Sequence, residues 1–128
     1  MDNIPLVTRL AGRCNSDGEF VLAARYWDGG LRLSIGADAL AFTIVGGEIM
    51  PAAGDAGARS GRIALRGPIG VWDKLLAPTP PPMFNDIMPA VAGGLVIESD
   101  GEILWQYYPA VRRLIDLLRD EVNRDGAV

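Results

Sequence analysis

The sequence predicts an α/β (α+β) domain with a single, mainly antiparallel sheet covered on one face by helices. Apolar and polar residues alternate in at least four short segments, which is the pattern of half-buried strands. Helical spacing of apolar residues occurs only near residues 19–27, 69–77 and 102–122. The chain has 128 residues, 49% of them hydrophobic, which suits one domain with a single core.

The first part of the chain contains one short helix. Residues 1–15 are expected to form a flexible, loosely attached arm. Ser16 and Glu19 fit the capping box that starts many helices. The helix should run from about Asp17 to Tyr26, and it is so short that it must lean on the rest of the protein or on a second copy. Its aromatic residues are the expected contacts of a homodimer: Phe20, Tyr26 and Trp27.

A three-stranded antiparallel meander is predicted next. Residues 31–35 and 40–44 alternate cleanly, with aliphatic side chains on one face. The glycine pair at 46–47 can supply the positive φ angles of a tight hairpin, after which residues 48–50 form the third strand. Residues 52–61 are small and rich in glycine, and they predict a mobile connection.

The second half adds a fourth strand at residues 62–66 and a second helix at residues 69–77. Pro68 suits the first turn of that helix, because the N–H that proline lacks would have no partner there. The proline-rich run at residues 78–82 ends the helix and predicts a stiff, extended segment. Residues 83–88 are expected to form one or two helical turns.

The last strand leads directly into the longest helix. Residues 95–98 have the β-branched alternation of a strand, and Asp100 is expected to cap the N–H groups of the helix that follows. Residues 102–122 then place a broad apolar face on that helix. Pro109 should either kink it or mark a junction between two helices. A short tail, residues 123–128, is expected after it.

The composition argues against catalysis and nucleic-acid binding. The net charge is −4, and the basic residues are scattered along the chain. Histidine is absent, and Cys14 and Lys74 are the single cysteine and lysine, so few residues could act as nucleophile or base. Glu98 and Asp100 are better explained as a strand end and a helix cap than as an acid–base pair or part of a Ca²⁺ loop. We therefore predict no enzymatic activity, cofactor or metal.

The expected location is the cytoplasm. Residues 4–10 are too short and interrupted for a signal peptide, and no apolar run approaches the roughly 20 residues of a membrane span. A single cysteine permits no intrachain disulfide and gives no sign of secretion.

Taken in order, these segments resemble the sterol carrier protein 2-like family of lipid-binding domains. Residues 29–35 are similar to the first strand of that family, and residues 62–76 to the strand and helix that follow it. Residues 94–100 are similar to the final strand, and the apolar helix after them to the closing helix. The resemblance covers about Glu19 to Arg119 and indicates one domain spanning residues 16–122.

The resemblance implies a five-stranded sheet and an apolar tunnel between sheet and helices for a fatty acid, acyl chain or sterol-like molecule. It carries over no catalytic residue. The chain departs from the family at Arg62, near which an acidic residue is often found, and at Ser99, which replaces a glycine. Its proline run is similar to that of bacterial versions, some of which are joined to or associated with enzymes, so a bacterial accessory protein is implied.

A ligand is expected where the layer of helices is least continuous, around residues 78–89, because prolines interrupt regular hydrogen bonding there. Met83 and its apolar neighbours form either the mouth of a tunnel or ordinary core filling, and the tryptophans either stack a ligand or belong to the core. The predicted ligand-binding residues are Phe42, Ile44, Trp72, Met83, Phe84, Ile87, Met88, Trp105 and Tyr108.

Two functions remain open from the sequence. The first is a non-enzymatic binding or carrier domain for a hydrophobic ligand. The second is a dimerisation or docking module that partners a separately encoded enzyme and binds no ligand of its own. An internal apolar cavity of about 300 Å³ or more would favour the carrier, whereas a filled interior beside an apolar interface would favour the module.

Overall fold

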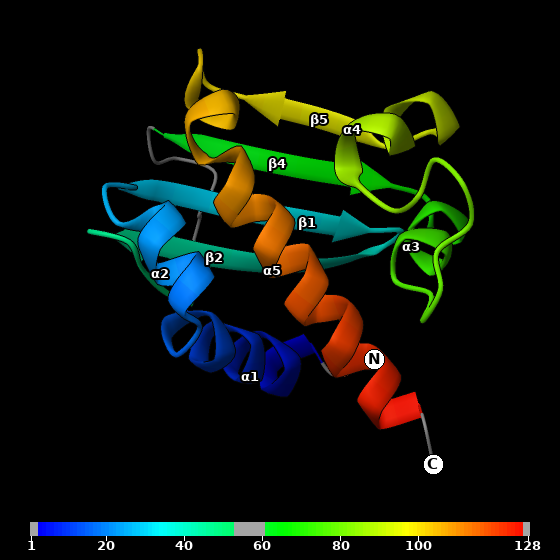
Figure 1. Ribbon diagram of the computed structural model, residues 1–128, viewed down its shortest axis with the longest axis horizontal. Helices are drawn as coiled ribbons and strands as arrows, with labels where there is room; N and C mark the ends of the chain where they lie inside the picture. Colours follow the sequence, from blue (N-terminus) through cyan, green and yellow to red (C-terminus); the bar gives the residue numbers. More distant parts are fainter. Residues whose placement is uncertain (1–2, 53–60, 127–128) are drawn as a thin grey trace.

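The computed structural model describes residues 3–52 and 61–126, which form a five-stranded sheet with helices on one face (Figure 1). Most of the predicted mobile connection at residues 52–61 lies outside the described residues. The elements are α1 (Asn3–Asn15), α2 (Gly18–Ala24), β1 (Gly29–Ile35), β2 (Asp38–Val45), β3 (Glu48–Pro51), β4 (Arg62–Gly67), α3 (Ile69–Leu75), α4 (Ile87–Ala90), the 3₁₀ turn η2 (Val91–Gly93), β5 (Val96–Ser99) and α5 (Ile103–Gly126).

The sheet has the order β3-β2-β1-β4-β5 and confirms the predicted fold class. β1 pairs in parallel with β4, and the other neighbours are antiparallel. Leu33 of β1 lies between Leu40 of β2 and Leu65 of β4, and all three are completely buried. Gly46 and Gly47 have φ angles of 57° and 83°, which confirms the tight hairpin predicted between β2 and β3.

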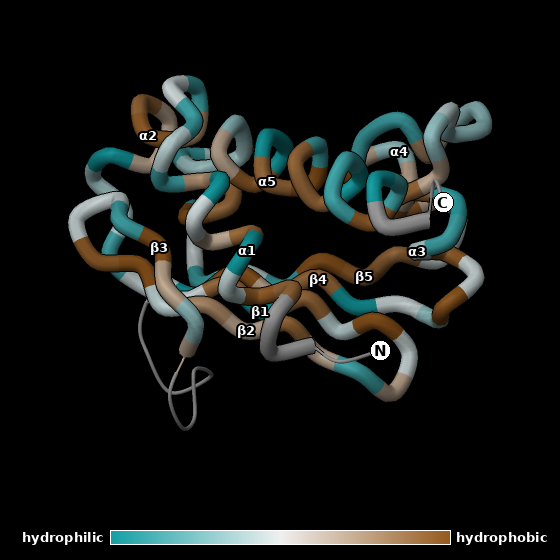
Figure 2. The backbone as a smooth tube through the Cα atoms, turned by 90° about the horizontal axis from the view of Figure 1, so that it is seen from below, coloured by the Kyte–Doolittle hydropathy of each residue, from teal (hydrophilic) through white to brown (hydrophobic). Residues whose placement is uncertain are grey.

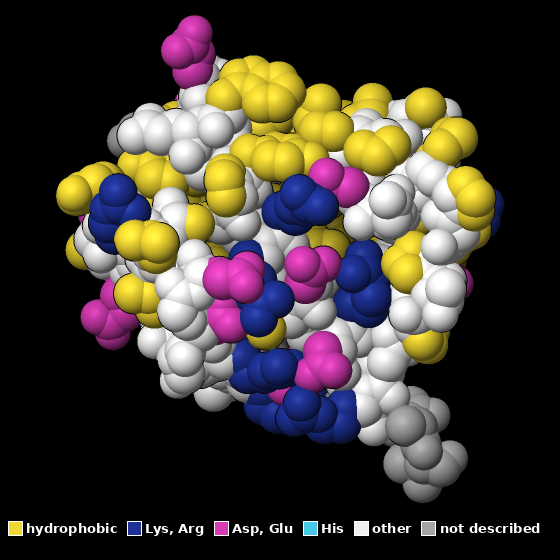
Figure 3. Space-filling view, viewed as in Figure 1, with side chains coloured by type: hydrophobic (Ala, Val, Ile, Leu, Met, Phe, Trp, Pro, Cys, Tyr) yellow, Lys and Arg dark blue, Asp and Glu magenta, His cyan; other side chains and the backbone are white. Residues whose placement is uncertain are grey.

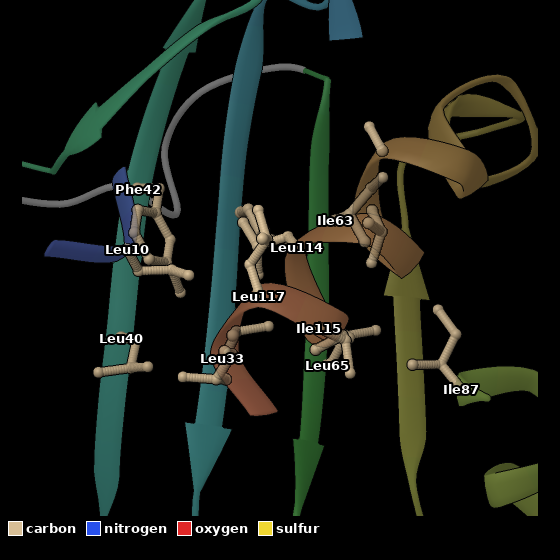
Figure 4. Packing of buried hydrophobic residues seen from close by; sticks show 14 of the residues in the cluster. Leu10, Leu33, Leu40, Phe42, Ile63, Leu65, Ile87, Leu114, Ile115 and Leu117 are labelled. Carbon is tan, nitrogen blue, oxygen red and sulfur yellow. The ribbon is translucent and has the colours of Figure 1, made fainter. Parts of the chain in front are cut away.

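The core fills the space between the sheet and the helices, which Figure 2 shows as two layers seen edge-on. α5 crosses the sheet diagonally, and its buried Leu114, Ile115 and Leu117 face the strands in Figure 4. Trp27 and Trp72 are buried with their indole N–H groups satisfied, donating to the carbonyl oxygens of Gly61 and Ser34 at 3.0 and 2.9 Å.

α1 corrects the expectation of a loosely attached arm. Residues 3–15 form a helix whose buried residues recur at helical spacing: Leu6, Val7, Leu10, Ala11 and Cys14. Ion pairs also join α1 to the end of α5: Arg13 lies 2.6 Å from Asp120 and 3.4 Å from Glu121, and Arg9 lies 3.2 Å from Glu121. The apolar stripe of α1 has to be covered by another part of the protein, and it packs against β3 and α5.

α2 has a different cap and a different role from those predicted. Asp17, rather than Ser16, is the N-cap, because its carboxylate accepts the N–H of Phe20 at 2.9 Å. The aromatic side of α2 faces inward: Phe20 and Trp27 are fully buried, and Trp27 stacks on Tyr107 with ring centroids 5.1 Å apart. The predicted dimer surface is therefore wrong for these two residues, and only Tyr26 is exposed.

α5 is also capped by a neighbour of the predicted residue. The Ser99 hydroxyl accepts the N–H of Leu104 at 3.0 Å, whereas the Asp100 carboxylate accepts the N–H of Arg62 at 3.1 Å and ties β5 to β4. The kink expected at Pro109 is confirmed, since Tyr107 has non-helical angles where two helices join. The helix continues to Gly126, so the predicted tail starts too early.

Candidate functional site

An apolar groove runs beside β5, between α4 and η2 on one side and the start of α5 on the other. We call it the β5 groove. Its volume is about 490 Å³, and every lining residue is apolar or glycine: Met88, Val91, Gly94, Leu95, Val96, Ile97 and Leu104. The volume lies within the range of about 300–1,000 Å³ typical of small-molecule sites. Since no charged side chain lines the groove, its walls are suited to hydrocarbon.

Two glycines and a buried aromatic ring shape one wall of the β5 groove. Gly94 has a φ of 117°, which lets the chain turn from η2 into β5. A Cβ atom at Gly93 would come within 2.4 Å of the Phe84 ring, so only glycine fits there with the ring in place. Phe84 itself is 7% exposed, and the Lys74 amine lies 5.1 Å from its ring centroid. Phe84 therefore supports the wall from behind.

A hydrogen-bonded cluster fixes the distance between α4 and α5 beside the groove. The Tyr108 hydroxyl donates to Asp86 Oδ2 at 2.6 Å, and Asp86 Oδ1 accepts the N–H of Ile87 at the start of α4. Arg112 Nε lies 3.6 Å from the same Asp86 Oδ2. Burial, together with the Asp86 carboxylate, raises the pKa of Tyr108 to about 12, so its hydroxyl remains a donor at neutral pH.

A second groove lies between α3 and the end of α5, and we call it the α3–α5 groove. Its volume is about 340 Å³, and its lining is mixed: Leu6, Ile35, Ile69, Trp72, Asp73, Leu76, Ala77, Pro78, Leu118, Val122 and Asn123. The Asn123 amide donates to the carbonyl oxygens of Leu76 and Arg119, both at 2.7 Å. This groove therefore has polar side chains in its wall, whereas the polar atoms of the β5 groove belong to the backbone.

Part of the predicted ligand site gathers at the β5 groove. Met88 is half-buried and lines it. Phe84 lies behind its wall, in contact with the position of Gly93. Tyr108 is half-buried and belongs to the cluster that joins α4 to α5, and Trp105, which is 63% exposed, lies next to it with ring centroids 6.1 Å apart. Contact between these residues and a ligand stays a prediction.

The other predicted residues lie elsewhere. Phe42, Ile44 and Ile87 are completely buried in the core, and Trp72 lines the α3–α5 groove. Met83 is 46% exposed and is absent from the lining of both grooves. The structure thus distributes over two grooves, the core and the surface a set of residues that the sequence pattern groups into one site.

Sequence reasoning misses most of the residues that line the β5 groove. It places Val96 and Ile97 in a strand and Leu104 on the apolar face of a helix, and it assigns Val91 to no element. Alternation identifies strand residues, but it does not tell which strand forms the edge of the sheet. The groove is created by β5 lying at that edge, next to two helical segments that are distant along the chain.

Cys14 is fully buried in α1, and burial raises the pKa of its thiol to about 12, so the thiolate is scarce at neutral pH. Among residues 3–52 and 61–126, no three histidine, cysteine or carboxylate side chains come together to hold a metal ion. None of the helices in these two ranges is long and apolar enough to cross a membrane.

The arrangement defines an α+β domain with a mixed, helix-covered sheet and an apolar groove at one edge. Two solved structures share this fold. The crystal structure of sterol carrier protein 2 matches with a TM-score of 0.65 at 15% identity, covering 90% of this chain and 94% of that chain. The solution structure of the conserved hypothetical protein TT1886 from Thermus thermophilus also has a TM-score of 0.65 at 15% identity, covering 94% and 88%.

These matches show that the chain has the sterol carrier protein 2 fold, which confirms at the level of fold the resemblance found in the sequence. No protein-family model matches the sequence, and no curated protein matches it either. At 15% identity the structural likeness concerns the fold, and function has to be inferred from the grooves.

Proposed function

We propose that this protein binds or carries a hydrophobic small molecule, such as a fatty acid, an acyl chain or a sterol-like molecule, in the β5 groove. The observation that carries the proposal is an open groove of about 490 Å³ lined by apolar side chains and glycine, in a chain with the sterol carrier protein 2 fold. Each methylene group of a ligand that becomes fully buried there would contribute about 0.8 kcal/mol.

The lining residues suit a ligand of variable shape. Met88 is unbranched and adjusts its conformation at little cost, while Val91, Ile97 and Leu104 provide branched walls. Tyr108 and Arg112, the polar residues that border α4 and α5, already interact with Asp86. A ligand with a polar head would therefore keep that head in water at the open side and place its hydrocarbon part in the groove.

We further propose that the protein is not an enzyme. Histidine is absent from the sequence, and the one thiol is buried with a raised pKa. The ionisable residues near the β5 groove serve structural roles: Asp86 caps α4, and Tyr108 donates to it. The cytoplasm stays our prediction for its location.

Ligand uptake in matched variants tests the binding proposal. Met88→Glu places a charge in the β5 groove, and Met50→Glu places the same charge on β3, where Met50 is 37% exposed and lines neither groove. We expect Met88→Glu to weaken uptake of a fluorescent fatty acid or sterol about tenfold or more, because the charge would have to be desolvated. Met50→Glu should bind like the unaltered protein.

Thermal unfolding of the same variants separates binding from stability. Both should remain folded, since Met88 is half-buried and Met50 exposed. The proposal would be contradicted if both folded variants took up the ligand as well as the unaltered protein, or if both lost uptake to the same extent. Native mass spectrometry of freshly purified protein adds an independent readout, because a co-purified lipid should appear with the unaltered chain and be depleted with Met88→Glu.

Two observations support the docking-module function. The core fills the space between the sheet and the helices, where a tunnel was expected. α2 and the residue pair after it expose an apolar strip, with Val21 46%, Leu22 63% and Tyr26 72% exposed. A partner could cover this strip without disturbing the core. The same mass spectra test this alternative: a dimer or a bound protein that is lost in Leu22→Glu, together with no lipid, would favour the module over the carrier.

A further inference from the structure

Bulky apolar side chains surround the open side of the β5 groove. Val91 and Val96, which line the groove, are 45% and 38% exposed, and Trp105, next to the lining residue Leu104, is 63% exposed. We call these three residues the β5 rim. In Figure 3 apolar side chains gather along the edge of the molecule formed by β5, α4 and the start of α5, and charged side chains cluster on the other half of that face.

Two ion pairs and one acidic side chain lie near the β5 rim. Arg66 of β4 donates to Glu98 of β5 at 2.7 Å, and Arg112 of α5 lies 3.6 Å from Asp86 at the start of α4. In each pair one positive charge meets one negative charge, and the exposed Glu102, three residues before Trp105, adds a negative charge, so the surroundings of the rim have no excess of positive charge. A surface of this kind has no long-range attraction for an anionic partner.

We propose that the β5 rim docks the protein on an electrically neutral lipid surface, with the open side of the β5 groove facing the lipid. The inference rests on the proposed function, because a ligand that is almost insoluble in water must be collected from a lipid phase. The residue types agree with this partner. Tryptophan is favoured at membrane–water interfaces, and aliphatic tips gain free energy on leaving water.

The geometry also explains how a ligand would move between the bilayer and the β5 groove. Val96 lines the groove on β5, and Trp105 follows the lining residue Leu104 on α5. With both side chains inserted among lipid headgroups, the apolar lining between them would continue directly into the lipid. A ligand would then move between bilayer and groove without crossing water, which is the step that limits the transfer of hydrophobic molecules.

Tryptophan fluorescence with vesicles tests docking in the unaltered protein. The chain has three tryptophans, and Trp27 and Trp72 are buried, so Trp105 alone can change its exposure on docking. We expect its emission to shift to shorter wavelength when phosphatidylcholine vesicles are added. The shift should persist at high salt, because the rim carries no net charge to be screened. No shift would overturn the proposal, as would binding that requires anionic lipid and disappears at high salt.

A pair of variants then locates the surface. Trp105→Glu and Leu22→Glu each replace a 63% exposed apolar residue, one on the β5 rim and the other on α2. In vesicle flotation we expect Trp105→Glu to lower partitioning about tenfold and Leu22→Glu to leave it unchanged, with both variants folded by circular dichroism. The assignment to the rim would be overturned if Leu22→Glu lowered partitioning more than Trp105→Glu, or if both lowered it equally. It would also be overturned if the unaltered protein formed a homodimer that is lost only in Trp105→Glu, because the rim would then bind a second copy.

Uptake of the fluorescent ligand in the absence of vesicles distinguishes the two proposals. If the unaltered protein takes up the ligand from solution and fails to partition onto vesicles, docking is wrong and ligand binding stands. If it partitions onto vesicles and takes up no ligand, the proposed function is wrong, and with it the reason given for docking.

Discussion

The two edges of the sheet are built in opposite ways. At the β3 edge, α1 packs alongside the strand, and the Asn15 side chain takes the place of a further strand: its amide donates to the Ile49 carbonyl oxygen at 2.7 Å, and its carbonyl oxygen accepts the Ile49 N–H at 3.0 Å. At the β5 edge, no described strand pairs with the outer side of β5, and the β5 groove runs beside it.

This difference indicates which edge is structural and which is available for binding. Exposed edge strands invite pairing with other chains, so proteins usually cover, shorten or charge them. The β3 edge is covered. The β5 edge is protected only by its length of four residues and by Glu98, and it is the edge to which the binding and docking proposals apply. The predictions below test the contrast, in order of decreasing effect.

The largest effect is expected from the covered edge. Leu10 of α1 is completely buried, so Leu10→Ala should lower the free energy of unfolding by about 2–5 kcal/mol, measured by urea denaturation. Val91→Ala at the open edge removes a side chain that is 45% exposed and should change it by no more than about 0.5 kcal/mol. If the two substitutions cost the same, the distinction between the edges fails.

A smaller effect is expected from the residue that closes the β3 edge. Asn15→Ala leaves the N–H and the carbonyl oxygen of Ile49 without their partner, and we expect a loss of about 1–3 kcal/mol. The uncovered strand should also make the variant more prone to aggregate, which light scattering would detect. The exposed Asn85→Ala serves as the matched control and should have little effect. An Asn15→Ala variant as stable and soluble as that control would show that α1 covers the edge without this side chain.

The contrast between the edges also explains what the sequence could reveal. The four segments whose alternation is clearest form β1, β2, β4 and β5, because alternation depends on neighbours along the chain. α1 carries a signal as well: Leu6, Leu10 and Cys14 recur every fourth residue, and Pro5 falls in the first turn, where proline is tolerated. The stripe alone does not distinguish a packed helix from an arm, because its covering surface, β3 with α5, is assembled only in the folded chain.

The candidate site was less accessible to sequence reasoning. Phe42 and Ile44 look like possible tunnel walls, yet they are fully buried, because a strand pattern gives the face of a residue without its depth. The β5 groove forms because α4, β5 and α5 meet at one edge of the sheet. The sequence around residues such as Val91 and Leu104 does not indicate that these elements come together. The caps were missed for a related reason. Ser16 and Asp17, like Ser99 and Asp100, are adjacent residues of capping type, and tertiary contacts decided between them.

The smallest effect concerns the side of the molecule away from the β5 groove, where Asp17 joins α2 to α5. Its carboxylate makes two contacts with the Arg113 guanidinium, at 2.9 and 2.8 Å, in addition to capping α2. The hydrogen bonds from Arg113 lower the pKa of Asp17 from 3.8 to about 2. The folded state therefore favours the carboxylate, and this contribution to stability is complete above about pH 4 and is lost as the pH falls toward 2.

Asp17→Asn keeps a capping oxygen but removes the negative charge, so it should lower the free energy of unfolding by about 1 kcal/mol at neutral pH. Between pH 4 and pH 2 the unaltered protein should lose stability more steeply than the variant, and the two curves should approach each other at the acid end. Urea denaturation at several pH values measures both slopes. Parallel curves would mean that Asp17 is not held as the carboxylate by Arg113. Trp105 emission in the presence of vesicles provides the comparison with the β5 edge: because Asp17 lies outside the β5 rim, Asp17→Asn should leave the emission shift at neutral pH unchanged.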